Sequence, residues 1–235
     1  EQGVRAVIEK PEGKIYKHQL LSIIELDLSG LSIERLDGID AARNLRVLNL
    51  SGNQIQDLTP ISRLKKLQQL NLNGNQISDL SPLSDITGLT ELILRQNMIS
   101  DIKPIENLKE LEKLDISRNK ITNIASVSNL ENLKELNLRE NQVIDISAVA
   151  ELNQLTYLNL HSNTMIEDIS PLEDLTTLQE LILRNIPIDD QLKHLSKLKA
   201  LRNLNIRNCS ITDFAPLIVL FQQGVLQDDE TTGIH

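Results

Sequence analysis

The chain repeats itself every 22 residues, and this period restricts its fold more than any other feature. Segments that begin at Leu45 and at every 22nd residue up to Leu155 read LxxLxLxxNxI or LxxLxIxxNxI, with small variations. The spacing lengthens to 23 residues before Leu178 and again before Leu201, and a degenerate copy begins at Ile23. Such a period indicates nine stacked units, because one unit alone cannot bury its apolar face.

The middle of each unit has the alternation of a short β-strand. In the second unit Leu48 and Leu50 fall on one face, whereas Val47, Asn49 and Ser51 fall on the other. Parallel strands lie about 4.8 Å apart, so residues at equal places in successive units form continuous columns. The repeats therefore predict a parallel sheet of about nine strands above an aliphatic core, to which Leu and Ile contribute most of their 71 positions.

A polar residue follows the strand in six of the nine units. These residues are Asn53, Asn75, Asn97, Asn119, Asn141 and Asn163. A carboxamide both donates and accepts hydrogen bonds, so an inward Asn can satisfy backbone groups of its own coil and of the adjacent coil. Cys209 occupies the same place in the last unit, where we expect a buried structural thiol rather than a reactive one.

The second half of several units combines a hydroxyl residue with proline. Thr59, Ser81 and Ser170 each precede a proline, which is the order of a helix N-cap and the first helical residue. Single turns of 3₁₀ or α-helix are therefore expected opposite the sheet. An acidic residue recurs just before these turns, at Asp57, Asp79, Asp101, Asp145, Asp168 and Asp213. One carboxylate per coil favours a role in the turn over a calcium site, which needs several oxygen ligands.

The repeats resemble the leucine-rich repeat family, and their endings are similar to the bacterial internalin-like class within it. These endings are DLTPI at 57–61, DLSPL at 79–83, DIKPI at 101–105 and DISPL at 168–172. The resemblance implies an α/β fold: a curved, right-handed leucine-rich repeat solenoid with a concave parallel sheet, short convex 3₁₀ or helical turns and an N-terminal helical cap. It also implies an extracellular or cell-surface setting, with a cytoplasmic one as the alternative.

The two ends of the chain differ from the repeats. Apolar residues near the start have helical spacing, so residues 1–22 are expected to form the N-terminal helical cap, followed by repeats over residues 23–220. An open end of a parallel sheet needs covering. We interpret residues 221–235 as the remnant of a C-terminal cap or as a linker, and the chain as a fragment of a longer protein.

Charge, cysteine content and motifs exclude several classes of function. The 33 acidic and 24 basic residues give a net charge of −9, which disfavours nucleic acid as a partner. One Cys and four separated His leave no zinc-binding spacing, so we expect no metal and no cofactor. No apolar run approaches the roughly 20 residues of a membrane span, and we expect no membrane insertion. Motifs of hydrolases, zinc proteases and nucleotide-binding enzymes are missing, so we expect no enzyme activity.

The outward face of the sheet is where a function is expected. The outward residues of each unit form three columns along this face. The third column is Ser29, Ser51, Asn73, Arg95, Ser117, Arg139, His161, Arg184 and Arg207. It gathers four arginines and a histidine in an acidic protein, beside one tyrosine and two isoleucines of the other two columns. Tyr and Arg are frequent energetic anchors of protein interfaces. The predicted ligand-binding residues are Ile93, Arg95, Glu135, Arg139, Tyr157, Asn159, His161, Ile182, Arg184 and Arg207. In the alternative interpretation the arginines simply pair with Glu91, Glu135 and Glu180 on the same face.

These observations predict a non-enzymatic recognition module that binds a protein on its concave face, as part of a larger bacterial surface or secreted protein. A glycan is the alternative ligand, and we expect the module to be monomeric. Two other interpretations stay open. One is a spacer or docking arm of a larger multidomain enzyme or envelope protein, and the other is an intracellular scaffold similar to phosphatase regulators.

Overall fold

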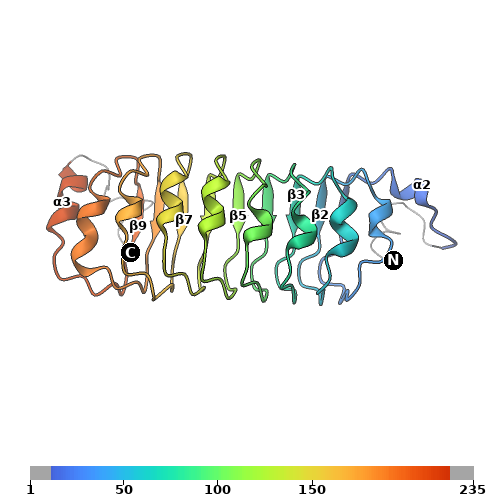
Figure 1. Cartoon of the computed structure of the whole chain (residues 1–235), viewed down its shortest axis with the longest axis horizontal. Coiled ribbons are helices and arrows are strands. Elements are labelled where there is room, and N and C mark those ends of the chain that lie inside the picture. The colour runs from blue at the N-terminus through green and yellow to red at the C-terminus, as the bar shows by residue number, and fades with distance from the viewer. Residues whose placement is uncertain (1–11, 223–235) are drawn as a thin grey trace.

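The computed structural model describes residues 12–222, which form a single row of coils (Figure 1). Each coil contributes one short strand, and neighbouring strands in the sheet are also neighbours in the chain, all paired parallel. The strands are β1 (Glu25–Asp27), β2 (Val47–Asn49), β3 (Gln69–Asn71), β4 (Glu91–Ile93), β5 (Lys113–Asp115), β6 (Glu135–Asn137), β7 (Tyr157–Asn159), β8 (Glu180–Ile182) and β9 (Asn203–Asn205). The predicted parallel sheet of about nine strands is confirmed.

The strands pair in the register that the repeat period predicts. Val47 lies opposite Gln69 at an offset of 22 residues, and the same offset holds up to Glu135 and Tyr157. The offset becomes 23 residues between Tyr157 and Glu180 without any loss of pairing. Residues at equal places in the repeats therefore form columns across the whole sheet.

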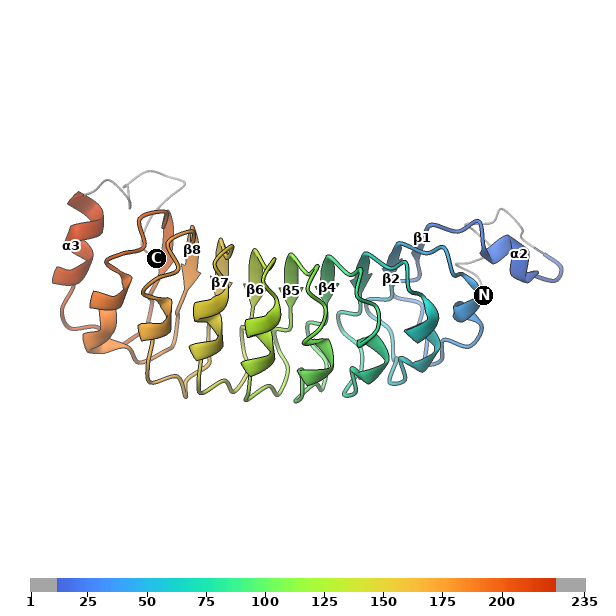
Figure 2. The ribbon, with the colours of Figure 1, turned by 45° about the horizontal axis from the view of Figure 1, so that its top comes forward.

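Short helices line the side of the coils opposite the strands. The 3₁₀ turns are η1 (Ile39–Ala41), η2 (Thr59–Arg63), η3 (Ser81–Leu83), η4 (Lys103–Ile105), η5 (Ala125–Asn129), η6 (Ser147–Glu151), η7 (Ser170–Leu172) and η8 (Asp189–Leu195). In Figure 2 both ends of the row rise toward the side on which the strands lie, so the sheet lines the inner face of a gentle curve. The predicted solenoid with a concave sheet and short convex turns is confirmed.

The 3₁₀ turns begin differently from the expectation that hydroxyl side chains cap them. Ser81 is the first residue inside its turn, and the N-cap position belongs to Leu80, which makes no capping bond with its side chain. Asp79 Oδ1 instead accepts the backbone N–H of Ser81 at 2.8 Å. Hydrogen bonding by the Ser81 side chain, and next by its N–H, lowers the pKa of Asp79. The hydroxyl caps were therefore a wrong prediction, because a carboxylate two residues earlier already accepts the free N–H.

The core between sheet and turns is aliphatic, and a buried row of asparagines borders it. Asn97 Nδ2 donates to the carbonyls of Leu72 and Leu94, both at 3.0 Å, and its Oδ1 accepts the N–H of Ile77 at 3.0 Å. In the last coil the thiol of Cys209 donates to the carbonyl of Leu183 at 3.1 Å. Burial raises the pKa of this thiol, as expected for a structural cysteine. The ladder across adjacent coils is confirmed.

Within residues 12–222 an α-helix lies at each end of the coils: α2 (Lys17–Leu20) precedes β1, and α3 (Ala215–Gln222) follows β9. The apolar residues near the start, on which the expected helical cap rests, lie outside the described residues. The limits 1–22, 23–220 and 221–235 therefore stay predictions. No helix within residues 12–222 is long and apolar enough to cross a membrane.

Candidate functional site

The structure places all ten predicted binding residues on the strand side of coils four to nine. Glu135 and Tyr157 begin β6 and β7, where they are direct neighbours in the first column. Ile93, Asn159 and Ile182 end β4, β7 and β8, in the second column. The third column, formed by the residues two positions after each strand, holds Arg95, Arg139, His161, Arg184 and Arg207.

In most coils the same hydrogen bond holds the backbone N–H of the third-column residue. In seven of the nine coils a side-chain oxygen of the second column accepts the backbone N–H of the third. The donors are Ser29, Ser51, Asn73, Ser117, Arg139, His161 and Arg207. This bond is an Asx turn, in which an Asp or Asn oxygen replaces a backbone acceptor.

Coils four and eight lack this bond. Ile93 and Ile182 occupy the second column there, and an aliphatic side chain offers no acceptor. Among the described residues no acceptor takes the backbone N–H of Arg95 or of Arg184. Both residues therefore present an unused backbone donor next to a guanidinium group.

The acidic residues of the first column pair along their own column rather than with the arginines. Lys113 Nζ lies 3.5 Å from Glu91 Oε1 and 3.6 Å from Glu135 Oε2. Arg139 pairs instead with Glu140, its chain neighbour, at 2.6 Å. Among the described residues none of Glu91, Glu135 and Glu180 forms an ion pair with an arginine, so the alternative pairing is not the arrangement in the structure.

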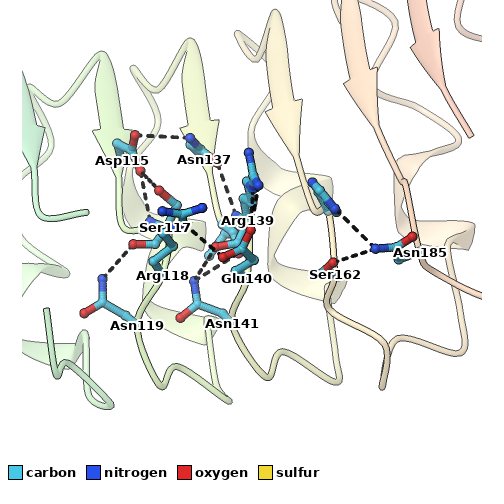
Figure 3. A network of polar contacts seen from close by, with 12 residues as sticks. Asp115, Ser117, Arg118, Asn119, Asn137, Arg139, Glu140, Asn141, Ser162 and Asn185 are labelled. Carbon is cyan, nitrogen blue, oxygen red and sulfur yellow. Dashed lines mark hydrogen bonds and ion pairs between the residues drawn. The ribbon is translucent and has the colours of Figure 1, made fainter. Parts of the chain in front are cut away.

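Glu140 pairs with two cations, because it faces both Arg139 and Arg118 (Figure 3). Arg118 Nε lies 2.9 Å from Glu140 Oε2. Asp115 is also engaged, because its carboxylate accepts bonds from Ser117 at 2.9 Å and from Asn137 at 3.1 Å. Most charged and polar side chains at the centre of the face, around β5 and β6, are therefore paired with one another.

Three arginines of the third column stand apart from this network. Within residues 12–222 no carboxylate forms an ion pair with Arg95, Arg184 or Arg207. The Nε atom of Arg184 is buried and has no hydrogen-bond partner among the described residues. An acidic protein thus keeps unpaired positive charge at two places on its concave face, near β4 and over β8 and β9.

Asn159 acts within the face rather than at its surface. Its side chain is buried, with 6% of the residue exposed. Its Nδ2 donates to the Tyr157 hydroxyl oxygen at 3.2 Å, and its Oδ1 accepts the N–H of His161 at 3.0 Å. Burial raises the pKa of Tyr157, so the ring is presented as a neutral phenol. Asn159 therefore positions the two side chains that flank it.

The surroundings of His161 favour its neutral form. Asn185 Nδ2 donates to Ser162 Oγ at 2.9 Å (Figure 3). The same Nδ2 lies 3.3 Å from His161 Nε2, and Asn185 Oδ1 accepts from Asn208 at 3.0 Å. With the Asn185 amide nitrogen as donor, this contact uses the tautomer of His161 in which Nε2 is the acceptor. Burial first, and then the charges of Arg139 and Arg184, lower the pKa of His161.

A fourth column, next to the third, was missed in the sequence analysis. Its residues all have positive φ, and they are Gly30, Gly52, Gly74, Gln96, Arg118, Glu140, Ser162, Asn185 and Asn208. The left-handed conformation favours glycine. Three glycines at one repeat position could therefore have predicted a positive φ for this column. In later coils this column supplies Glu140 and Asn185, which contact Arg139 and His161. No group of His, Cys, Asp and Glu suited to a metal ion occurs among residues 12–222.

Comparison with protein families gives one match. A family model described as leucine-rich repeats (two copies) matches residues 43–85, 87–130 and 131–174, which together are more than half of the chain. A search of curated protein sequences finds no significant match.

Several solved structures are similar to this chain. Internalin C2 from Listeria monocytogenes has a TM-score of 0.62 and 29% identity, over 75% of this chain and 88% of that chain. The ectodomain of the plant membrane receptor kinase GASSHO1/SCHENGEN3 from Arabidopsis thaliana has a TM-score of 0.78 and 22% identity, over 94% of this chain and 28% of that chain. The plant peptide hormone receptor RGFR1 has a TM-score of 0.65 and 25% identity, over 86% of this chain and 37% of that chain.

Proposed function

The chain belongs to the leucine-rich repeat family, and from this premise we propose that it is a non-enzymatic recognition module that binds a protein on its concave face. The internalin-like character of its repeats agrees with the similarity to internalin C2. The observation that carries the proposal is the unpaired positive charge of Arg95, Arg184 and Arg207 in a protein of net charge −9. Charge left without a partner on a rigid face is available to a ligand.

The chemistry of the face favours a protein over a glycan. Half-buried isoleucines lie beside arginines, and the Tyr157 ring is held by Asn159. Aliphatic, aromatic and guanidinium groups together are typical of the anchors of protein interfaces. The backbone needs no rearrangement, because every strand is paired in register with its neighbours. A preorganised face loses little conformational entropy on binding.

The setting is proposed from the similar proteins. The receptor RGFR1 was solved in complex with RGF2, so a repeat array of similar shape binds a polypeptide ligand in that protein. The similarity to internalin C2 supports a bacterial surface or secreted setting for this chain. We expect the module to act there as one part of a larger protein.

Two triple variants, one on each side of the solenoid, test the proposal. The concave variant combines Tyr157→Ala, His161→Ala and Arg184→Ala, and the convex control combines Lys103→Ala, Asn129→Ala and Glu151→Ala, which are exposed residues of the 3₁₀ turns. Each immobilised protein is incubated with a library of extracellular proteins, and captured partners are measured by isothermal titration calorimetry. We expect the concave variant to weaken each genuine partner at least tenfold and the convex control to leave affinity unchanged. A partner that the concave variant binds as tightly as the unmodified protein contradicts the proposal.

A further inference from the structure

Two strands of the sheet carry the same five residues. The sequence Glu-Leu-Ile-Leu-Arg occurs at 91–95, on β4, and again at 180–184, on β8. These are also the two coils in which isoleucine replaces the Asp or Asn of the second column. The same outward residues therefore occur twice on one face, with Arg95 exposed and Arg184 half-buried.

Each copy presents two hydrogen-bond donors without acceptors. The backbone N–H groups of Arg95 and Arg184 are unused within the described chain, and neither guanidinium has a carboxylate partner. In the other seven coils an Asp or Asn oxygen takes the equivalent N–H. A ligand oxygen that reached Arg95 or Arg184 would therefore replace an acceptor that the rest of the sheet supplies itself.

The shape and charge of each copy specify the ligand group. A guanidinium beside a backbone N–H matches a carboxylate, which accepts charge-assisted bonds from both donors. The half-buried Ile93 and Ile182 add an apolar contact next to that carboxylate. At the other end of β4, Glu91 already has Lys113 at 3.5 Å, so the acidic group of the ligand belongs at the arginine end.

We propose that β4 and β8 form two similar subsites that together bind one extended acidic segment of a partner protein. Each subsite takes one carboxylate at the arginine and one neighbouring apolar side chain at the isoleucine. The inference rests on the proposed function, since it names the chemistry of the partner on the same concave face. Arg139 and His161 lie in the third column between the two subsites and line the path of the segment.

The separation of the subsites sets the spacing of the ligand groups. Four strand steps of about 4.8 Å separate β4 from β8, which gives about 19 Å. An extended peptide covers about 3.3 Å per residue, so its two acidic groups should lie about six residues apart. Two linked contacts bind far more tightly than one, because the second contact forms at high effective concentration.

Synthetic peptides test the spacing directly. The probe is a fluorescent peptide with two Asp-Leu units whose aspartates are six residues apart in a Ser-rich chain. The comparison peptides carry one unit, two units three residues apart, or Asn in place of Asp. Fluorescence anisotropy at one fixed salt concentration measures each Kd. We expect the six-residue peptide to bind at least tenfold more tightly than the others, and equal affinity at both spacings overturns the proposal.

Variants that carry the residue found at the equivalent position of other coils test where the peptide binds. Ile93→Asn and Ile182→Asn introduce the residue found at this position in other coils, so the fold is retained and the N–H gains its usual acceptor. Either substitution should reduce the affinity of the six-residue peptide to that of the one-unit peptide, and Arg95→Gln should act alike. Arg63→Gln, on the convex side, removes the same charge and should change nothing.

The outcomes separate this inference from the proposed function. If the peptides bind equally to the Ile93→Asn variant and the unmodified protein, the two-subsite inference is wrong. If the concave variant nevertheless loses its protein partners, the proposed recognition on that face is still supported. Partners insensitive to the concave variant would instead contradict the proposed function itself.

Discussion

Single asparagines connect the coils through buried hydrogen bonds. Asn97 accepts from a backbone group of the preceding coil and donates to carbonyls of that coil and its own. With only 9% of the residue exposed, water does not easily replace these partners. Each ladder residue therefore contributes to the contact between two coils and not only to its own turn.

The replacement Asn97→Ala should lower the free energy of unfolding by about 2–4 kcal/mol, since each buried group left unsatisfied costs about 1–3 kcal/mol. Chemical denaturation monitored by circular dichroism measures the change. The control Lys120→Ala removes an exposed side chain of the next coil and should stay within about 0.5 kcal/mol of the unmodified protein. Equal losses in the two variants would show that the ladder bonds add nothing.

The 3₁₀ turn depends on a carboxylate that lies outside the turn. Asp57, Asp79 and Asp168 each accept the N–H of the residue two positions later at 2.8 Å. Hydrogen bonding by those residues lowers the pKa of all three carboxyl groups. The element is therefore stabilised most when these groups are ionised.

At neutral pH, Asp79→Ala should destabilise the protein by about 1 kcal/mol, as loss of a capping oxygen usually does, and Asp79→Asn should destabilise it less because an acceptor remains. The pKa of Asp79 is lower in the folded than in the unfolded protein. Its stabilisation is therefore complete above the unfolded value, about 3.9, and is lost as pH falls through the folded value. Urea denaturation between pH 7 and pH 2 measures this. A stability difference between the unmodified protein and the Asp79→Asn variant that persists undiminished at pH 2 contradicts the assignment.

Within residues 12–222, each coil packs against the coils that precede and follow it in the row. Contacts between neighbouring strands join consecutive coils from β1 to β9, and contacts between neighbouring turns add to most of these junctions. Leu114 in β5 has a coil on each side, whereas Leu26 begins the sheet in β1. In such an array stability is a sum of unit and neighbour contributions, so position along the row matters.

We expect Leu114→Ala to lower the free energy of unfolding by about 2–5 kcal/mol, because it leaves a cavity between two packed coils. Leu26→Ala should loosen the first coil locally. Hydrogen exchange followed by mass spectrometry distinguishes the two, with protection lost only near β1 in the second variant. Equal loss of protection along the entire row after Leu26→Ala would mean that the coils unfold as a single unit.

The repeat period by itself determined the fold and the columns of the face. A strand of alternating residues that recurs every 22 or 23 positions allows one register, since a shift by one residue would turn every leucine to solvent. The positions of Tyr157, His161 and Arg184 on adjacent strands followed from counting alone. The repeated Glu-Leu-Ile-Leu-Arg is visible in the sequence. Its importance emerged only from the structure, in which the other coils bond the backbone N–H of the third-column residue to an Asp or Asn oxygen.

Only the tertiary structure decided which polar groups satisfy one another. Glu135 had several cations within reach of its column, and the structure pairs it with Lys113, while Glu140 takes Arg139. The alternation of the strand predicts that Asn159 is a surface residue. In the structure its side chain is buried and forms hydrogen bonds with its neighbours. The physical reason is that the period sets where each backbone position lies, to within the width of a coil. Hydrogen bonds and ion pairs depend on differences of an ångström among side chains that the period leaves equivalent.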